Sequence, residues 1–145
     1  ALGEKPVNIA PAINIIIAQR LVRKVCQKCG QLKTISAEQM KKIKKELKGL
    51  PKKIKMPNLT EKTKIPQAKG CKYCNFSGYK GREAIFESFL IDDEMENFIL
   101  RSPSISSLRK LAKKKGMVSM RQDGFIKILE GTTTIEEVER VTLAE

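Results

Sequence analysis

Apolar residues recur every fourth position from Ile13 to Val25, and this spacing predicts an amphipathic helix over residues 10–25. Arg20 and Arg23 fall on the polar side of this helix. A functional interpretation would have both arginines contact phosphate or a neighbouring subunit. The spacing by itself favours a solvated polar face.

A second amphipathic helix is predicted over residues 37–48, where a narrow apolar stripe is flanked by lysines. Ser36 and Gln39 form a capping box at its start, and a glycine and a proline end it. Residues 51–68 are rich in proline, lysine and threonine. This composition predicts a loop with one short strand over residues 64–67.

The second half of the chain predicts one strand and then a series of helices. Alternating residues favour a short strand over 82–91. Its residues expected to be partly buried are Ile85, Phe86, Phe89 and Leu90. Four short helices follow, and their predicted caps are Asp92, Ser119 with Gln122, and Thr134 with Glu137. Their apolar residues are expected to form the core of a small helical bundle.

The charge of the chain bears on its partners. The 145 residues carry a formal net charge of +13, and histidine is absent. Nucleic acid, an anionic membrane surface or a solvated basic surface within a larger protein would each explain this charge. The lysine-rich helix has no interleaved aromatic residues for base stacking, so nucleic acid is not the expected partner. Without histidine, most forms of general-base and Cys–His catalysis are excluded.

The sequence predicts neither a membrane-spanning segment nor a signal peptide. No apolar run approaches the roughly 20 residues that cross a bilayer, and the N-terminal residues lack a cleavable apolar core. Because the chain opens without methionine, we interpret it as a piece of a longer protein. Paired cysteines without a secretory signal are typical of a reducing cytosol, so a cytoplasmic location is expected.

The four cysteines form two C-x-x-C pairs, Cys26 with Cys29 and Cys71 with Cys74. Each pair places two thiolates on one tight turn, and two such turns supply the four sulfurs of a tetrahedral Zn²⁺ site. The metal would close residues 30–70 into a loop. It would leave no position for water, so its role would be structural. The alternatives are two disulfides, four reduced core thiols, or a redox-active C-x-x-C, which lacks its usual βαβ setting here.

Three motifs, in chain order, resemble one protein family. The first is I-A-Q-R-L-V-R at residues 17–23, followed by the first cysteine pair. The second is G-C-x-x-C-x-x-x-G-Y-x-G-R at residues 70–82. The third comprises G-M-x-x-M-x-x-D-G-x-x-K at residues 116–127 and G-x-T-T-x-E-E-V-x-R-V at residues 131–141. Together they resemble the region after the catalytic core of type II secretion and type IV pilus assembly ATPases, and they cover nearly the whole chain.

The resemblance implies a cytoplasmic, hexameric, RecA-like ATPase that docks under an inner-membrane platform protein and powers fibre assembly. It also implies that Cys26, Cys29, Cys71 and Cys74 bind zinc in a module that protrudes from the ATPase core. The phosphate-loop motif G-x-x-x-x-G-K and a histidine box are absent from this sequence. ATP and Mg²⁺ are therefore expected only in the full-length parent. No catalytic or nucleotide-binding residue is predicted here, and the chain alone should not turn over ATP.

The expected fold is mainly α with a short β element, without the RecA-like P-loop core. Residues 1–25 are predicted as a helix leading out of the ATPase core, 26–91 as a tetracysteine zinc module, and 92–145 as a C-terminal helical bundle. The lysine-rich insert 31–69 matches no motif. The expected roles are structural, with contacts to the chain's own ATPase core, neighbouring subunits and the platform protein, peripheral to the inner membrane. The alternative function is a stand-alone basic zinc-binding module that binds nucleic acid.

Overall fold

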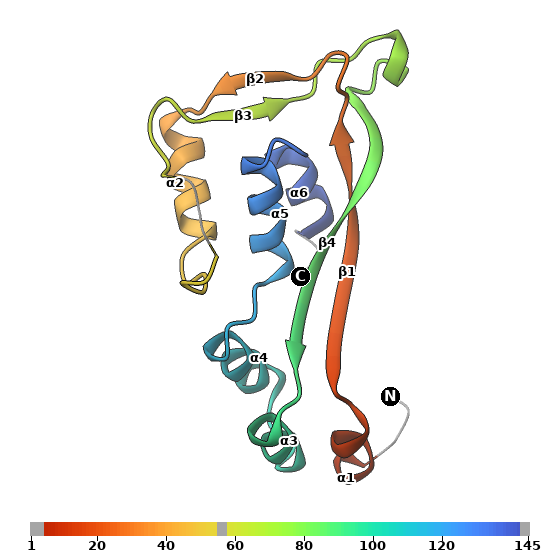
Figure 1. The fold of residues 1–145 in the computed structure, drawn as a ribbon, viewed down its shortest axis with the longest axis vertical. Helices are drawn as coiled ribbons and strands as arrows, with labels where there is room; N and C mark the ends of the chain where they lie inside the picture. Colours follow the sequence, from red (N-terminus) through yellow and green to blue (C-terminus); the bar gives the residue numbers. More distant parts are fainter. Residues whose placement is uncertain (1–4, 55–57, 143–145) are drawn as a thin grey trace.

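A long antiparallel pair of strands, called the hairpin below although its strands are far apart in the chain, runs the length of the molecule (Figure 1). The other elements are arranged along it. The computed structural model describes residues 5–54 and 58–142. Its first elements are α1 (Pro6–Ile9), the 3₁₀ turn η1 (Ala10–Ala12) and strand β1 (Ile15–Val25). Strand β1 pairs with β4 (Tyr79–Leu90), from Ile15 opposite Leu90 to Arg23 opposite Arg82. The register shifts after Arg23, so that Val25 lies opposite Tyr79.

The predicted helix over residues 10–25 is wrong, because most of this segment is strand β1. Residues four apart share one face of a strand as well as one face of a helix, so the spacing did not separate the two. The three consecutive isoleucines, Ile15 to Ile17, are β-branched and fit a pleated strand better than a helix. The partner strand β4 lies more than 50 residues further along the chain, and pairing with it makes this segment a strand and not a helix.

A second, smaller sheet joins the two cysteine pairs to the lysine-rich segment. It consists of β2 (Gln31–Thr34) and β3 (Lys64–Gln67) in antiparallel register. Strand β3 confirms the predicted strand at 64–67, whereas β2 was not predicted. Between them lies α2 (Ala37–Glu46), which begins with the predicted capping box of Ser36 and Gln39.

The four predicted C-terminal helices are confirmed. They are α3 (Asp93–Leu100), α4 (Ile105–Lys114), α5 (Met120–Leu129) and α6 (Ile135–Thr142). Asp92 caps α3, Ser119 and Gln122 form a capping box on α5, and the Glu137 amide donates to Thr134 before α6. No helix in the part of the chain that the structure describes has the length and apolar character needed to cross a bilayer.

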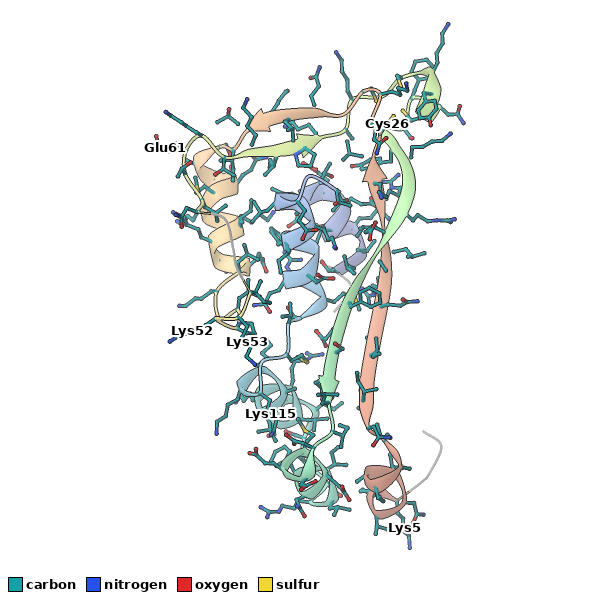
Figure 2. All side chains as sticks on the ribbon, viewed as in Figure 1. Lys5, Cys26, Lys52, Lys53, Glu61 and Lys115 are labelled. Carbon is teal, nitrogen blue, oxygen red and sulfur yellow. The ribbon has the colours of Figure 1, made fainter. Side chains whose placement is uncertain are left out.

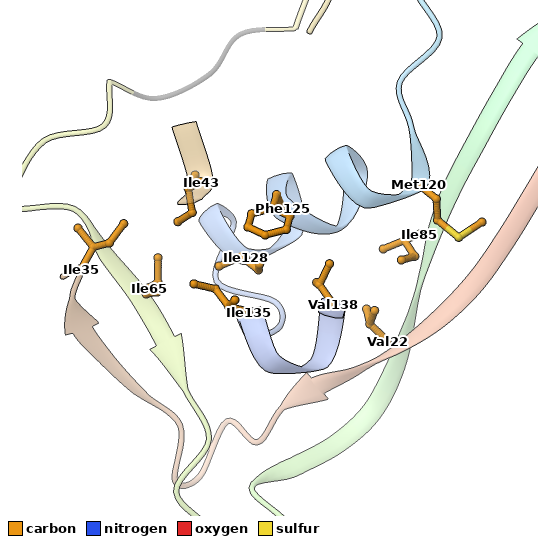
Figure 3. Close-up of a cluster of buried hydrophobic side chains, with 10 residues drawn as sticks. All are labelled: Val22, Ile35, Ile43, Ile65, Ile85, Met120, Phe125, Ile128, Ile135 and Val138. Carbon is orange, nitrogen blue, oxygen red and sulfur yellow. The ribbon is translucent and has the colours of Figure 1, made fainter. Parts of the chain in front are cut away.

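These helices pack as two pairs and not as the single bundle that was predicted. Helices α5 and α6 lie beside the hairpin, between it and α2 (Figure 1). Their core includes Phe125, Ile128 and Val138, which contact residues from both sheets and from α2 (Figure 3). Helices α3 and α4 enclose a second cluster around Met95 at the other end of the hairpin. The apolar faces of these helices therefore pack against the strands as well as against one another.

The hairpin buries one face and exposes the other. Val22 and Ile85 are fully buried against α5 and α6, whereas Phe86 and Leu90 are exposed, contrary to the prediction that both are partly buried. Side chains alternate along a strand, so a buried Ile85 places Phe86 on the opposite face. The structure fits the prediction of a mainly α fold in outline. It also contains two small sheets, and its β component is more extensive than expected.

Candidate metal centre

The structure brings together all four predicted ligand residues, Cys26, Cys29, Cys71 and Cys74, at the end of the hairpin. Their sulfur atoms all lie within 4.8 Å of one another. The Cys74 sulfur lies 3.7 Å from that of Cys29 and 3.8 Å from that of Cys71. Four sulfurs placed tetrahedrally about 2.3 Å from a zinc ion would be roughly 3.8 Å apart. The spacing of the thiols therefore fits a tetrahedral metal ion.

The first cysteine pair forms a turn directly after β1. The amide of Cys26 donates to the Gly78 carbonyl at 2.9 Å, which fixes this turn to the one that carries the second pair. The Gly30 amide donates back to the Cys26 carbonyl at 2.7 Å. A Cβ atom at Gly30 would lie 2.4 Å from the Val25 side chain, so the turn requires glycine there. This closure directs both sulfurs toward the second pair.

The second pair lies on the 3₁₀ turn η2 (Lys72–Cys74) and the tight loop that follows it. The Cys74 sulfur accepts hydrogen bonds from the amides of Cys71 at 3.2 Å and Gly78 at 3.3 Å. Gly78 has φ +80°, and a Cβ atom there would lie 2.7 Å from Cβ of Ala68. Amide donors aimed at a sulfur stabilise its thiolate form, which is the form that binds metal.

The pKa values of the clustered thiols diverge. Burial raises the pKa of Cys74, but the amide donors and the neighbouring thiols outweigh it and lower the value to about 6. Burial and the adjacent cysteines raise the pKa of Cys29 to about 12. All four cysteines are free, and sulfurs 3.7 Å apart are far beyond the roughly 2.05 Å of a disulfide. The structure therefore shows a cluster of thiols and no disulfide.

A network around Glu137, which the sequence did not predict, fixes the C-terminal tail to the hairpin beside the cysteines. The Glu137 carboxylate accepts hydrogen bonds from the backbone amide and guanidinium of Arg23 and from the guanidinium of Arg140. The Arg23 guanidinium stacks on the Tyr79 ring at 4.3 Å, and the Tyr79 hydroxyl lies 2.9 Å from that of Thr134. All five residues fall within or beside the recognised motifs, which was the available signal.

The Glu137 carboxylate is charged although its side chain is 0% exposed. Burial raises its pKa, but hydrogen bonds from Arg140 and Arg23 outweigh burial and lower the value from 4.5 to about 2. Arg23 is therefore held in an internal ion pair and is not part of a simple solvated face. Arg20 likewise donates to the carbonyl of Val141.

Two further hydrogen bonds join the tail to the last residues of β1. The Val25 amide donates to the Thr132 carbonyl at 2.9 Å, and the Thr133 hydroxyl donates to the Arg23 carbonyl at 2.9 Å. The loop between α5 and α6 is thereby bonded to the end of β1, directly before Cys26. The position of the first cysteine pair depends on the C-terminal tail as well as on the hairpin.

Two charged side chains of the lysine-rich helix α2 form ion pairs with the C-terminal helices. Lys42 pairs with Glu139 at 2.6 Å, and Glu46 pairs with Arg121 at 2.8 Å. These pairs tie α2 to α5 and α6, on the side where Ile43 is buried. The remaining lysines of α2 are Lys41, Lys44 and Lys45, and all three are exposed.

Comparisons with known proteins all match this chain to one protein family. Residues 1–140 match the family model described as type II/IV secretion system protein. The type IV pilus assembly ATPase PilB of Thermus thermophilus is 36% identical over 94% of this chain and 14% of its own length. The type II secretion system protein E of Dickeya dadantii is 36% identical over 99% of this chain and 26% of its own length. The chain thus spans about a quarter or less of the length of these relatives.

Proposed function

The chain belongs to the type II/IV secretion system protein family, and from this premise we propose that it is the metal-holding, partner-contacting portion of a hexameric ATPase. That ATPase would power type IV pilus assembly or type II secretion, as the names of its relatives indicate. The proposed location is cytoplasmic and peripheral to the inner membrane, through contact with a platform protein. Family membership favours this role over a stand-alone nucleic-acid-binding module.

The observation that carries the proposal is the convergence of four thiols from two distant turns. Cys29 and Cys74 are separated by 45 positions in the chain and lie 3.7 Å apart at sulfur. Cys26 and Cys71 complete the cluster. Soft thiolate ligands in a tetrahedral set favour Zn²⁺. With all four positions taken by sulfur, the ion would leave no site for water and would stabilise the module without taking part in a reaction.

Cobalt substitution tests the ligand set directly. The chain reloaded with Co²⁺ is expected to show intense visible bands of tetrahedral geometry and near-ultraviolet bands of sulfur-to-metal charge transfer. Replacing Cys29 with serine should weaken the charge-transfer bands, because one sulfur is lost. The matched control is Ser77→Ala, which lies on the turn of the second cysteine pair and leaves all four sulfurs. Equal spectra for both variants would contradict the assignment of Cys29 as a ligand.

The catalytic machinery of the parent would lie outside this sequence. The chain contains no G-x-x-x-x-G-K motif, so ATP and Mg²⁺ would bind to another part of the full-length protein. We expect the isolated chain to show no ATP hydrolysis above a buffer control. The gene is expected to encode a phosphate loop upstream of residue 1, and a reading frame without one would contradict the ATPase role.

The outer face of the hairpin supports a contact with the ATPase core or with a neighbouring subunit. Its exposed apolar residues are Ile15, Ile17, Leu21, Phe86 and Leu90. A contiguous exposed apolar strip of this kind is typical of an interface. In the full-length protein, Ile17→Ser with Leu21→Ser should impair hexamer assembly, measured by light scattering. Leu32→Ser on β2 is the control, because Leu32 is equally exposed and lies outside this face.

A further inference from the structure

The turn that carries the second cysteine pair ends in an exposed aromatic apex. Phe76 is 71% exposed and Tyr73 is 54% exposed. Figure 1 shows this turn projecting beyond the ends of β1 and β4, and Figure 2 shows Cys26 at its base. Within residues 72–77 only Cys74 is buried. The two aromatic side chains therefore extend away from the core of the molecule.

The backbone at Phe76 does not explain why phenylalanine occupies this position. Its φ is +59°, in the left-handed region that favours glycine or asparagine over a bulky residue. The conformation is held by the Phe76 amide, which donates to the Cys71 carbonyl at 2.9 Å. Gly70 also lies close to the backbone of Phe76, because a Cβ at Gly70 would be 2.6 Å from the Phe76 carbonyl oxygen. The side chain neither fills the core nor suits the turn, so its role lies outside the folded chain.

Positive charge surrounds this apex. The ammonium groups of Lys80 and Lys28 lie 4.7 and 6.0 Å from the centre of the Tyr73 ring. Lys69 and Lys72 are exposed on the same turn. No aspartate or glutamate occurs between residues 62 and 82 or between residues 15 and 36, the two segments that build this end of the molecule. The four lysines, Lys28, Lys69, Lys72 and Lys80, are called the lysine collar below.

We propose that this apex inserts into the headgroup region of an anionic bilayer. Phe76 would enter the boundary with the acyl chains, while the lysine collar would contact lipid phosphates. An acidic peptide or a DNA duplex would use the lysines but would leave the protruding Phe76 in water, and a single-stranded nucleic acid would stack a base on it without burying it among acyl chains. The inference goes beyond the proposed function, because contact with lipid requires no platform protein.

Vesicle binding by the metal-loaded chain tests the apolar part of the proposal. The chain should bind vesicles of phosphatidylcholine mixed with phosphatidylglycerol more tightly than vesicles of phosphatidylcholine alone. Phe76→Asn should reduce binding to the anionic vesicles about tenfold, the loss expected when part of a phenylalanine side chain no longer leaves water. Asparagine tolerates the left-handed conformation, so metal content and the urea midpoint should not fall. The control is Ile105→Asn on α4, where the side chain is 78% exposed.

Paired charge variants test the lysine collar. Replacing Lys69 and Lys72 with glutamine should weaken binding to anionic vesicles by about fivefold for each lysine. Replacing Lys52 and Lys53 removes the same charge from a loop on the other side of the molecule (Figure 2). That control should change binding less than twofold. Equal losses in both pairs would mean that net charge alone attracts the chain, and would overturn the proposal.

A tryptophan reporter separates lipid insertion from surface attraction. The sequence contains no tryptophan, so Phe76→Trp provides a single fluorophore at the apex. Its emission should shift to the blue with anionic vesicles and should be quenched by brominated acyl chains, whereas Ile105→Trp should show neither effect. Unshifted emission from the apex reporter, or undiminished vesicle binding by Phe76→Asn, would overturn insertion. Tighter binding to polyglutamate, duplex DNA or single-stranded DNA than to vesicles would assign the apex to an acidic macromolecule instead.

Discussion

Neutralising Glu137 should destabilise the fold, because its buried carboxylate joins the C-terminal helix to the hairpin. A pKa lowered from 4.5 to about 2 corresponds to ~3 kcal/mol at about 1.4 kcal/mol per pH unit between the two values. The side chains of Arg23 and Arg140 are 45% and 55% exposed, so solvent screening reduces the contribution to roughly 2 kcal/mol. Glu137→Gln should therefore lower the free energy of unfolding at pH 7 by about 2 kcal/mol.

The pH dependence of this effect has a definite sign. The folded-state pKa of Glu137 lies below its unfolded value of 4.5, so the stabilisation is complete above about pH 4.5. It is progressively lost as the pH falls through about 2, below which the carboxylate is protonated in both states. The difference between the parent chain and Glu137→Gln should therefore shrink across this range. Acid also removes metal from thiolates, so the two proteins must be compared at each pH and not across pH values.

Urea unfolding followed by circular dichroism measures both effects. The matched control is Glu136→Gln, an exposed carboxylate in the same helical turn, which should change the free energy of unfolding by less than about 0.5 kcal/mol. A stabilising role for the buried Glu137 carboxylate would be excluded if Glu137→Gln were no more destabilising than Glu136→Gln at pH 7. The same role would be excluded if the difference in the free energy of unfolding persisted undiminished at pH 2.

Three further variants test local features. Gly78→Ala should weaken metal affinity in a competition titration, because its Cβ would lie 2.7 Å from Ala68 and disturb the amide that donates to sulfur; unchanged affinity would contradict this. Tyr79→Phe should cost about 1 kcal/mol in urea unfolding, since it loses the bond to the Thr134 hydroxyl, and a neutral result would make that bond dispensable. Ser119→Ala should lower the free energy of unfolding by about 1 kcal/mol, because it removes the N-cap of α5. An unchanged free energy of unfolding would show that tertiary packing alone holds the N-terminal end of α5.

The sequence predicted those features that depend on near neighbours. The capping boxes at Ser36 and Ser119 each involve a partner three positions away, so their signals are local. The cysteine cluster spans a longer separation but was also predicted, because metal chemistry restricts the type, number and spacing of ligands. Both kinds of feature follow from rules that do not require knowledge of the fold.

The missed features depend on contacts between distant segments. Strand β1 was predicted as a helix because its partner β4 lies far along the chain, and apolar residues four apart fit either structure. Arg23 was assigned to a solvated face because Glu137, its partner, lies 114 positions away. The division of the C-terminal helices into two pairs likewise depends on where the hairpin and α2 pack.

The most direct test of the metal centre is the metal content of the purified chain, combined with its helicity as a strong chelator is added. We predict one zinc ion per chain and loss of structure on chelation. The two cysteine turns share no sulfur-to-sulfur bond, and without the ion the hydrogen bond from Cys26 to Gly78 would be left to hold four clustered thiols together. Absence of metal, together with four titratable thiols and an unchanged circular dichroism spectrum, would contradict the account. The four cysteines would then be packing residues.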